Sequence, residues 1–367
     1  MTDKLRVLFV LPLPPPVHGS AVVSSQIKHS VIVNDAFCCD WVNLSTSRST
    51  EELWKRKPVK LFRFLASFFK TFALLLTHRY DLCYLSITCH GEPFLKDAPF
   101  VLLCKLFGRR VVIHQHNKGM AGDVSRWPYS FILPWVYRNS KVILLSKILY
   151  SDIERIVPES NVLICPNGIK VSGDYEKRTG RAKVPGLLFL SNLIESKGVL
   201  VLLDALQILK KRNYAFNCTF VGGQTREISF ERFSNEVRRR NLEDSVICRG
   251  PLFGDEKVKC LRAADIFVFP SFYANECFPL VVLEAMSYGL PVVSTGEGGI
   301  PDMVEDGITG LITEKNNSRS LSDAIARLLD DNGLSLKLGE AGRLRLEKMY
   351  TEEIFERNIL TCLNRCI

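Results

Sequence analysis

Short apolar runs alternate with helix-length segments along the 367 residues, and this alternation restricts the chain to few folds. Most of the runs are rich in β-branched residues and hydrophobic at consecutive positions, as parallel strands covered on both faces are. The alternation occurs in both halves of the chain, which predicts two doubly wound, Rossmann-like α/β domains. The expected strands are 7–11, 37–42, 82–85, 111–113, 142–145 and 162–165, then 187–190, 218–221, 246–248, 266–269 and 292–294.

A polar segment at 170–185 separates the two halves. It contains Gly173, Gly180 and Pro185 and has almost no hydrophobic pattern, which is typical of a linker. The expected domains are therefore 1–170 and 171–345. Ligands of open α/β sheets bind beyond the carboxyl ends of the strands, so two such domains facing across a cleft would hold the functional site there.

The net charge of +9 belongs to the N-terminal half. Residues 1–170 hold 22 Lys+Arg and 12 Asp+Glu, which leaves 26 and 27 for the rest of the chain. Much of the surplus lies in 55–76, where Lys and Arg interleave with Phe and Leu. A basic, phenylalanine-rich helix can lie in a membrane interface, so we expect an anionic membrane surface as partner. A core helix with a basic solvent edge is the alternative.

Cysteine usage and the apolar runs bear on the compartment. The 12 cysteines form no CxxC pair, which favours free thiols in a reducing compartment over a disulfide framework. The apolar run 5–13 stops at three prolines without a cleavage site, so no signal peptide is expected. No run reaches roughly 18 apolar residues, so no spanning helix is expected. Together these features predict a cytoplasmic, peripherally membrane-associated protein.

The densest chemical signal lies at 265–312. An expected strand ends at Pro270, a loop runs to Glu276, and a helix begins at Pro279, a residue suited to a first helical turn. A helix N-terminus after a strand is a site for phosphate. Glu284 lies about 7.5 Å further along the axis, where a carboxylate could accept hydrogen bonds from ribose hydroxyls. Glu276 would then face the sugar.

Each glutamate also has a simpler interpretation. Glu276 could cap the helix, and Glu284 could be a solvated helix charge. Glu284, however, lies in the apolar stretch 281–286, and a carboxylate there needs partners that offset its desolvation.

The motifs Glu276-Cys277-Phe278-Pro279-Leu280, Glu284-Ala285-Met286, Gly289-Leu290-Pro291 and Gly298-Gly299-Ile300-Pro301 closely resemble glycosyltransferase family four. These are retaining enzymes of the GT-B fold. The resemblance implies an acceptor-binding domain at 1–170, a nucleotide-sugar-binding domain at 171–345, and a helix at about 346–367 that packs back on the first.

The resemblance also assigns roles in the donor site. Glu276 and Glu284 fall on the family's Glu-x7-Glu motif, which implies that Glu276 contacts the transferred sugar and Glu284 the ribose. Lys197 matches the donor-phosphate lysine and is expected to serve catalysis. The remaining expected donor-binding residues are Asn192, where the family usually has arginine, Gly250 and Pro251 beside the base, and Phe278, Pro279 and Leu280, where backbone N–H groups would cradle the diphosphate.

In the N-terminal half, the resemblance points to histidines. His116 aligns with a family histidine at the donor sugar and the reaction centre, and His114 lies two residues earlier on the same expected strand end. Because residues two apart share a strand face, a swap of their roles stays open. The loop at 14–20 resembles the family's glycine-rich loop, with His18 and Gly19 in place of Gly-Gly. Gly19 would allow close approach of a phosphate or acceptor.

These features predict a retaining, hexosyltransferase-type enzyme that moves a sugar from a UDP- or GDP-linked donor to a glycan or lipid-linked acceptor, in cell-surface polysaccharide biosynthesis. The sequence has no Asp-x-Asp triplet, so neither a metal nor another cofactor is expected. Two alternatives stay open: a GT-B nucleotide-sugar epimerase or hydrolase, and a non-catalytic nucleotide-binding module. A dehydrogenase is disfavoured because no G-x-G-x-x-G follows the first strand. Nucleic acid is disfavoured because the acidic pair would repel a polyanion.

Overall fold

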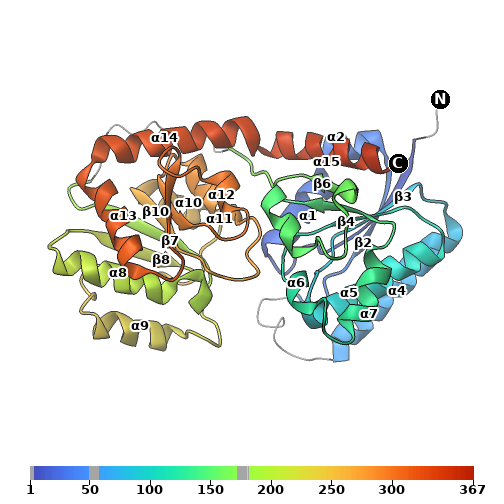
Figure 1. Cartoon of the computed structure of the whole chain (residues 1–367), viewed down its shortest axis with the longest axis horizontal. Coiled ribbons are helices and arrows are strands. Elements are labelled where there is room, and N and C mark those ends of the chain that lie inside the picture. Colours follow the sequence, from blue (N-terminus) through green and yellow to red (C-terminus); the bar gives the residue numbers. More distant parts are fainter. Residues whose placement is uncertain (1–3, 49–57, 172–179, 181) are drawn as a thin grey trace. The chain divides into compact units, whose positions relative to one another are not determined.

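The computed structural model of the chain describes residues 4–48, 58–171, 180 and 182–367. It divides into two compact units, and the colours of Figure 1 follow the sequence through them. The N-terminal unit comprises residues 1–168 and 352–367, and the C-terminal unit comprises residues 169–351. The expected linker at 170–185 lies largely outside the described residues, as do residues 55–57 of the expected basic helix.

The N-terminal unit is built on a six-stranded parallel sheet in the order β2-β1-β3-β4-β5-β6. Every residue of β3 and β4 is buried, because helices cover both faces of the sheet. The strands are β1 (Arg6–Leu11), β2 (Cys38–Asn43), β3 (Leu82–Leu85), β4 (Val111–His114), β5 (Lys141–Leu144) and β6 (Val162–Ile164).

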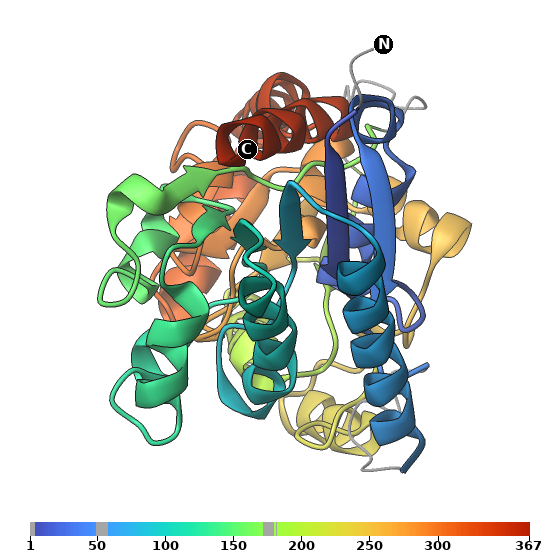
Figure 2. The same cartoon turned by 90° about the vertical axis from the view of Figure 1, so that its right-hand side faces the viewer.

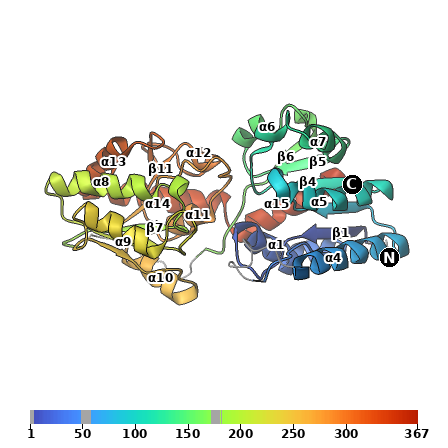
Figure 3. The same ribbon diagram turned by 90° about the horizontal axis from the view of Figure 1, so that it is seen from below.

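The helices of this unit form two layers. One layer contains α4 (Pro58–Thr77), α5 (Gly91–Leu106) and α7 (Tyr129–Tyr137), which lie side by side in Figures 2 and 3. The other contains α1 (Gly19–His29), α2 (Val31–Ala36) and α15 (Glu352–Cys366), which contact one another. Shorter helices are α6 (Met120–Asp123), η1 (Lys147–Asp152) and η2 (Glu159–Asn161).

The C-terminal unit repeats the design with a six-stranded parallel sheet in the order β12-β11-β10-β7-β8-β9. Its strands are β7 (Gly186–Leu190), β8 (Asn217–Val221), β9 (Val246–Cys248), β10 (Ile266–Phe269), β11 (Val292–Thr295) and β12 (Gly310–Thr313). Its helices are η3 (Glu195–Lys197), α8 (Val199–Lys211), α9 (Phe230–Arg239), α10 (Gly254–Ala263), α11 (Leu280–Ser287), α12 (Ile300–Met303), α13 (Ser318–Asp330) and α14 (Asn332–Met349). Two parallel sheets flanked by helices confirm the α/β fold class expected from the sequence.

Two elements differ from the sequence-based expectation. Strand β12 was not expected; it begins at Gly310, where an added Cβ would lie 2.4 Å from the carbonyl oxygen of Val292. The helix expected at about 346–367 is two helices, because α14 ends at Met349 and α15 begins at Glu352. Only α15 belongs to the N-terminal unit.

All 12 cysteines are free thiols, and eight of them are buried. A search of the described helices for one long and apolar enough to cross a membrane finds none.

Candidate active site

The loop that follows β10 is fixed by the neighbouring strand β11. The hydroxyl of Ser294 donates to the carbonyl oxygen of Phe269 (2.6 Å), and that of Thr295 donates to the carbonyl oxygen of Ser271. Ser271 is fully buried. The carboxyl end of β10 therefore presents a rigid support for the residues up to Glu276.

Glu276 and Lys197, expected to lie in one site, are in direct contact. Lys197 Nζ donates to Glu276 Oε2 at 2.6 Å, and Ser271 Oγ donates to the same oxygen at 3.0 Å. The two side chains of the ion pair are 15% and 8% exposed, so the pair is largely shielded from water. The ammonium group also lies 4.6 Å from the ring centroid of Tyr273 and 5.6 Å from that of Phe269.

A close backbone approach brings Lys197 to this loop. Gly198 has φ +87°, and a Cβ on it would lie 2.3 Å from the carbonyl oxygen of Pro270. The N–H of Phe272 donates to the carbonyl oxygen of Ser196 at 2.8 Å. The glycine therefore permits the contact between the loops that follow β7 and β10, and Lys197 is positioned by it.

Helix α11 begins beside Glu276. Pro279 occupies the N-cap position without a side-chain hydrogen bond, and Leu280 is the first helical residue. The first N–H groups of a helix have no acceptor within the helix. The preceding chain is held by Gly298 (φ +57°), where an added Cβ would lie 2.4 Å from the carbonyl oxygen of Glu276. Together these features give the site a helix N-terminus with its partial positive charge.

Glu284, on the second turn of α11, is held by a lysine that the sequence did not point to. Lys257 Nζ, on α10, donates to Glu284 Oε1 at 2.7 Å. The other oxygen, Oε2, is buried and has no hydrogen-bond partner in the described protein. A buried carboxylate oxygen without a partner is a ready acceptor for a ligand hydroxyl.

The expected donor residues Asn192, Gly250 and Pro251 lie in loops that follow β7 and β9. Asn192 is exposed, and its side-chain oxygen accepts from the N–H of Gly223 (3.1 Å). The carbonyl oxygen of Gly250 accepts from the N–H of Gly222 (2.9 Å), and Pro251 is exposed. Asn192, which stands where the family usually has arginine, therefore joins two loops of the protein.

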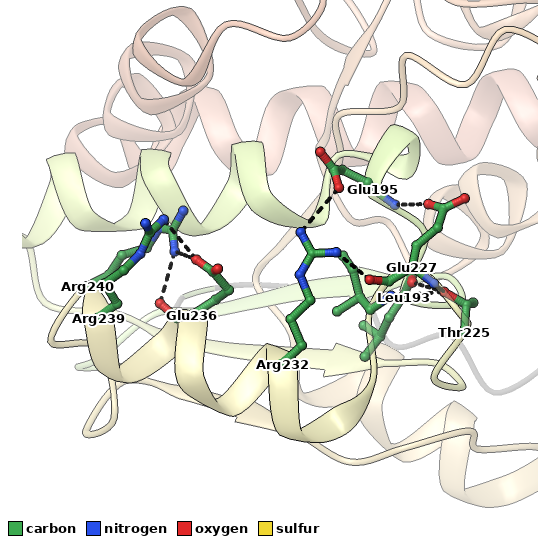
Figure 4. Close-up of polar contacts among 9 residues, drawn as sticks. Leu193, Glu195, Thr225, Glu227, Arg232, Glu236, Arg239 and Arg240 are labelled. Carbon is green, nitrogen blue, oxygen red and sulfur yellow. Dashed lines mark hydrogen bonds and ion pairs between the residues drawn. The ribbon is translucent and has the colours of Figure 1, made fainter.

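A polar network, drawn in Figure 4, ties the Lys197 loop to α9. Arg232 bonds Glu195 Oε2 (3.4 Å) and the carbonyl oxygen of Glu227, and the Glu227 carboxylate accepts from the N–H of Glu195 (2.9 Å). The hydroxyl of Thr225 donates to the carbonyl oxygen of Leu193 at 2.6 Å. These contacts fix the segment from which Lys197 projects.

The expected histidines all belong to the N-terminal unit. His114 ends β4, is fully buried, and its Nδ1 meets the Tyr84 hydroxyl at 2.5 Å. The ring of His116 lies 4.1 Å from that of His114, between centroids. His114 is part of the core, whereas His116 is half-buried, which favours His116 as the ring that meets a ligand.

Burial decides the protonation of these rings. It lowers the pKa of His116 to about 3, with a smaller contribution from nearby His18, and it lowers the pKa of His114 well below its ordinary value. Both nitrogens of His116 and Nε2 of His114 are buried without a hydrogen-bond partner in the described protein. His116 is therefore a neutral imidazole with free hydrogen-bonding capacity.

His18 and Gly19 form the start of α1. His18 Nδ1 accepts from the N–H of Ala21 (3.4 Å) and contacts Ser20 Oγ (3.1 Å), so His18 caps the helix. Its pKa is lowered by burial and, less strongly, by the charge of Lys96. An added Cβ on Gly19 would meet no atom within 4 Å, so the protein leaves open space there.

The sequence reasoning left two residues of this site without a role. Ser271 lies in the loop that leads to Glu276, but nothing in the sequence shows that its hydroxyl meets the carboxylate. Lys257 gives no signal, because its ion pair with Glu284 joins two different helices. Within the described ranges, no group of three or more His, Cys, Asp or Glu side chains could hold a metal ion.

Comparisons with known proteins identify the C-terminal unit. Residues 174–345 match the family model of glycosyl transferases group 1. The amylovoran biosynthesis glycosyltransferase AmsK of Erwinia amylovora is 30% identical over 183 residues, 49% of this chain and 44% of the relative. The putative colanic acid biosynthesis glycosyltransferase WcaL of Escherichia coli is 30% identical over 183 residues, 48% of this chain and 44% of the relative. Each match thus spans less than half the length of the curated relative.

Solved structures match over nearly the whole chain. Sucrose-phosphate synthase from Thermosynechococcus elongatus superposes with a TM-score of 0.77 at 18% identity, covering 99% of both chains. HepE of Anabaena, solved in complex with UDP and glucose, superposes with a TM-score of 0.72 at 17% identity, covering 98% of this chain and 100% of its own. The resemblance drawn from the sequence is therefore confirmed: residues 174–345 match the model of the glycosyl transferases group 1, and the chain has the two-domain GT-B fold.

Proposed function

We propose that the protein is a retaining, hexosyltransferase-type glycosyltransferase that moves a sugar from a nucleotide-diphosphate donor to a glycan or lipid-linked acceptor. The observation that carries the proposal is the shielded Lys197–Glu276 ion pair, which lies beside the N-terminus of α11. A nearby cation and a helix N-terminus are suited to the negative charge that grows on a diphosphate leaving group.

Each candidate residue then has a chemical task. Lys197 and the N–H groups at the start of α11 bind the diphosphate, while Glu284 Oε2 accepts from a ribose hydroxyl. Glu276 contacts the transferred sugar. His116 acts as a neutral hydrogen-bonding group at that sugar, because its lowered pKa prevents protonation near neutrality. The acceptor oxygen is the nucleophile.

The comparisons support the choice of substrates. HepE was solved with UDP and glucose, which favours UDP over GDP as the carrier of the donor sugar. The names of AmsK and WcaL refer to amylovoran and colanic acid biosynthesis, which supports a role in making a cell-surface polysaccharide. His18, Gly19 and their loop would lie on the acceptor side.

We further propose that transfer needs neither a metal nor another cofactor, because Lys197 and α11 supply the positive charge that a metal would otherwise bring. Activity that is lost with EDTA and restored by Mg²⁺ would contradict this part. The protein is also proposed to work at the cytoplasmic face of a membrane, with α4 as its contact.

A thermal-shift screen with UDP, GDP, ADP and their sugars tests the donor site. UDP or a UDP-sugar should raise the melting temperature, Glu284→Ala should remove that shift, and Glu276→Ala should keep it while turnover falls. Stabilisation by none of the nucleotides would refute the donor site, and equal loss of binding and turnover in Glu276→Ala would refute its assigned role.

A second measurement separates transfer from the alternative functions. Product analysis with a donor that gives stabilisation should show sugar attached to an acceptor with the anomeric configuration retained. Isomerised or hydrolysed donor as the sole product, at any acceptor concentration, would instead identify an epimerase or hydrolase. Nucleotide binding with no chemistry on the donor would identify a binding module.

A further inference from the structure

Helix α4 carries two apolar stripes, and the described fold buries residues of only one of them. Phe64 and Phe68 each lie 5.6 Å from the ring of Phe100 on α5, between centroids, and Thr71 and Leu75 are buried on the same side. The second stripe repeats with alternating spacings of three and four residues, which places it along one face of the helix. It is exposed and consists of Phe62, Leu65, Phe69, Phe72 and Leu76.

The exposed apolar surface continues across the two neighbouring helices. On α5 it includes Leu106, which is 81% exposed, and before and along α7 it includes Trp127, Phe131 and Trp135, spaced four residues apart. Trp127 is 86% exposed. Among the described residues, half of the 24 exposed large hydrophobic side chains lie here. This α4–α5–α7 face consists of Val59, Leu61, Phe62, Leu65, Phe69, Phe72, Leu76, Leu102, Leu106, Trp127, Phe131 and Trp135.

The topology places these three helices in one layer. Strands β2, β3, β4 and β5 are joined in turn through α4, α5 and α7, and each connection moves across the sheet in the same direction. Because parallel connections are right-handed, helices reached in this way lie on the same face of the sheet. Figure 3 shows the three side by side.

A row of arginines borders this layer. Arg79, Arg110 and Arg138 each lie in the turn between one of the helices and the strand that follows it, and all three are exposed. Since β3, β4 and β5 are adjacent and parallel, these turns lie at the same edge of the sheet. None of the three arginines forms an ion pair with a described acidic residue.

Acidic groups are scarce on the same surface. Neither α4 nor α7 contains Asp or Glu, and of the two acids in α5, Asp97 is buried. Within α4, Arg63 and Lys70 donate to the backbone carbonyls of Thr46 and Trp41. The surface is therefore apolar in the middle and positively charged at its margin.

We propose that the α4–α5–α7 face docks on an anionic lipid bilayer, with its aromatic and aliphatic side chains at the acyl boundary and the arginine row on the headgroups. This inference rests on the membrane contact in the proposed function and extends it from α4 to three helices. A helical partner would cover one stripe, whereas exposure spread over three adjacent helices, with helix axes roughly 8–10 Å apart, fits a plane. Amphipathic Trp and Arg side chains suit the zone between acyl chains and headgroups.

Tryptophan fluorescence tests whether α7 lies at the bilayer. A membrane contact made by α4 alone would not bring α7 there. One variant keeps only Trp135 and another only Trp41, which stacks on Phe9 at 4.2 Å in the sheet; every other Trp becomes Phe. With vesicles of phosphatidylglycerol and bromine-labelled phosphatidylcholine, Trp135 should be quenched and shift to the blue, and Trp41 should not. Vesicle binding without quenching of Trp135 would overturn the proposal, as would no binding.

Vesicle sedimentation of the full chain tests the charges. About 1 kcal/mol for each cation near an anionic surface corresponds to roughly fivefold in affinity, so Arg79→Gln, Arg110→Gln and Arg138→Gln together should weaken binding roughly 100-fold at low salt. The matched control replaces three exposed arginines elsewhere, Arg238, Arg319 and Arg357, and should bind like the parent. Equal losses in both triple variants would overturn the proposal.

A third measurement tests the apolar side chains, and it also tests whether a second copy of the chain covers the α4–α5–α7 face. Phe69→Ser with Phe131→Ser should reduce vesicle binding at least tenfold, whereas Val31→Ser with Leu344→Ser, exposed apolar positions outside the face, should not. If the parent is instead a dimer in solution that Phe69→Ser and Phe131→Ser dissociate, a second copy covers the face and the proposal is wrong. A nucleotide-induced thermal shift in each variant confirms that the variant is folded. Because this shift reports the donor site and vesicle binding reports docking, failure of one can be told from failure of the other.

Discussion

The ammonium group of Lys197 lies 2.6 Å from the carboxylate of Glu276, although 79 residues separate them along the chain. Each comes from a loop at the carboxyl end of a parallel strand, Lys197 after β7 and Glu276 after β10, and these strands are neighbours in the sheet. The contact therefore follows from the fold of the C-terminal unit. Four predictions concern this pair and other candidate residues of the two units.

Breaking the Lys197–Glu276 pair should cost stability as well as activity. Glu276→Gln leaves the shielded ammonium without its counter-charge, which should lower the free energy of unfolding by about 3 kcal/mol in urea titrations. Glu256→Gln is the matched control, because Glu256 also lies 2.6 Å from a lysine, Lys259, but both side chains are exposed. That variant should unfold at nearly the same urea concentration as the parent, because exposed ion pairs contribute little to stability; equal effects would show that burial of the first pair has no energetic weight.

Gly298 should not tolerate a side chain. An alanine there would combine φ +57° with a Cβ placed 2.4 Å from the carbonyl oxygen of Glu276, so Gly298→Ala should destabilise by about 2 kcal/mol or more and reduce turnover. At Gly296 the nearest atom to an added Cβ is Pro301 Cγ at 4.0 Å, and Gly296→Ala should be nearly neutral. Thermal melts and turnover of the two variants make the comparison, and a stable, active Gly298→Ala would contradict the geometry.

Lys257 should act on nucleotide affinity through Glu284. Lys257→Met removes the hydrogen bond to Oε1 and leaves the carboxylate free to rotate, so UDP affinity measured by calorimetry should fall roughly tenfold, whereas Lys257→Arg should keep most of it. Lys259→Met, two residues along the same helix, is the control. Unchanged UDP affinity in Lys257→Met would show that Glu284 needs no orientation.

The histidines with a lowered pKa should make stability depend on pH. Because the pKa of His116 is lowered to about 3 while an unfolded histidine titrates near 6.5, only the unfolded chain binds this proton between those values. Stability should therefore fall as the pH drops from about 6.5 toward 3, by up to about 1.4 kcal/mol per pH unit for each such group. His116→Gln should flatten the dependence measured by urea titration at several pH values; a slope identical to the parent's would contradict a neutral His116.

Most strands of the two sheets could be predicted, because short runs of consecutive apolar, β-branched residues are typical of parallel strands that are covered on both faces. Strand β12 escaped prediction because it begins with glycine and ends with threonine, so that only Leu311 and Ile312 form its apolar run. The α4 segment shows a different limit. Its two apolar stripes look alike in the sequence, and only packing against Phe100 separates the core stripe from the exposed one.

Some residues of the candidate site could also be predicted from the sequence, and others could not. Glu276 and Glu284 could be named because they lie in a motif with fixed spacing, and Lys197 because it matches the family's donor-phosphate lysine. Lys257 and Ser271 could not be given roles, because these depend on which side chains meet across the fold. The burial of His114 was equally hidden, since strand alternation puts His114 and His116 on one face and gives no measure of depth.

The way α15 joins α1 and α2 has a consequence for synthesis. The N-terminal unit is synthesised first, but its helix α15 consists of residues 352–366. The ribosome therefore makes this helix only after the whole of the C-terminal unit. On the ribosome, where domains generally fold as units as the chain emerges, the C-terminal unit can thus complete its fold while the first sheet still waits for its last covering helix.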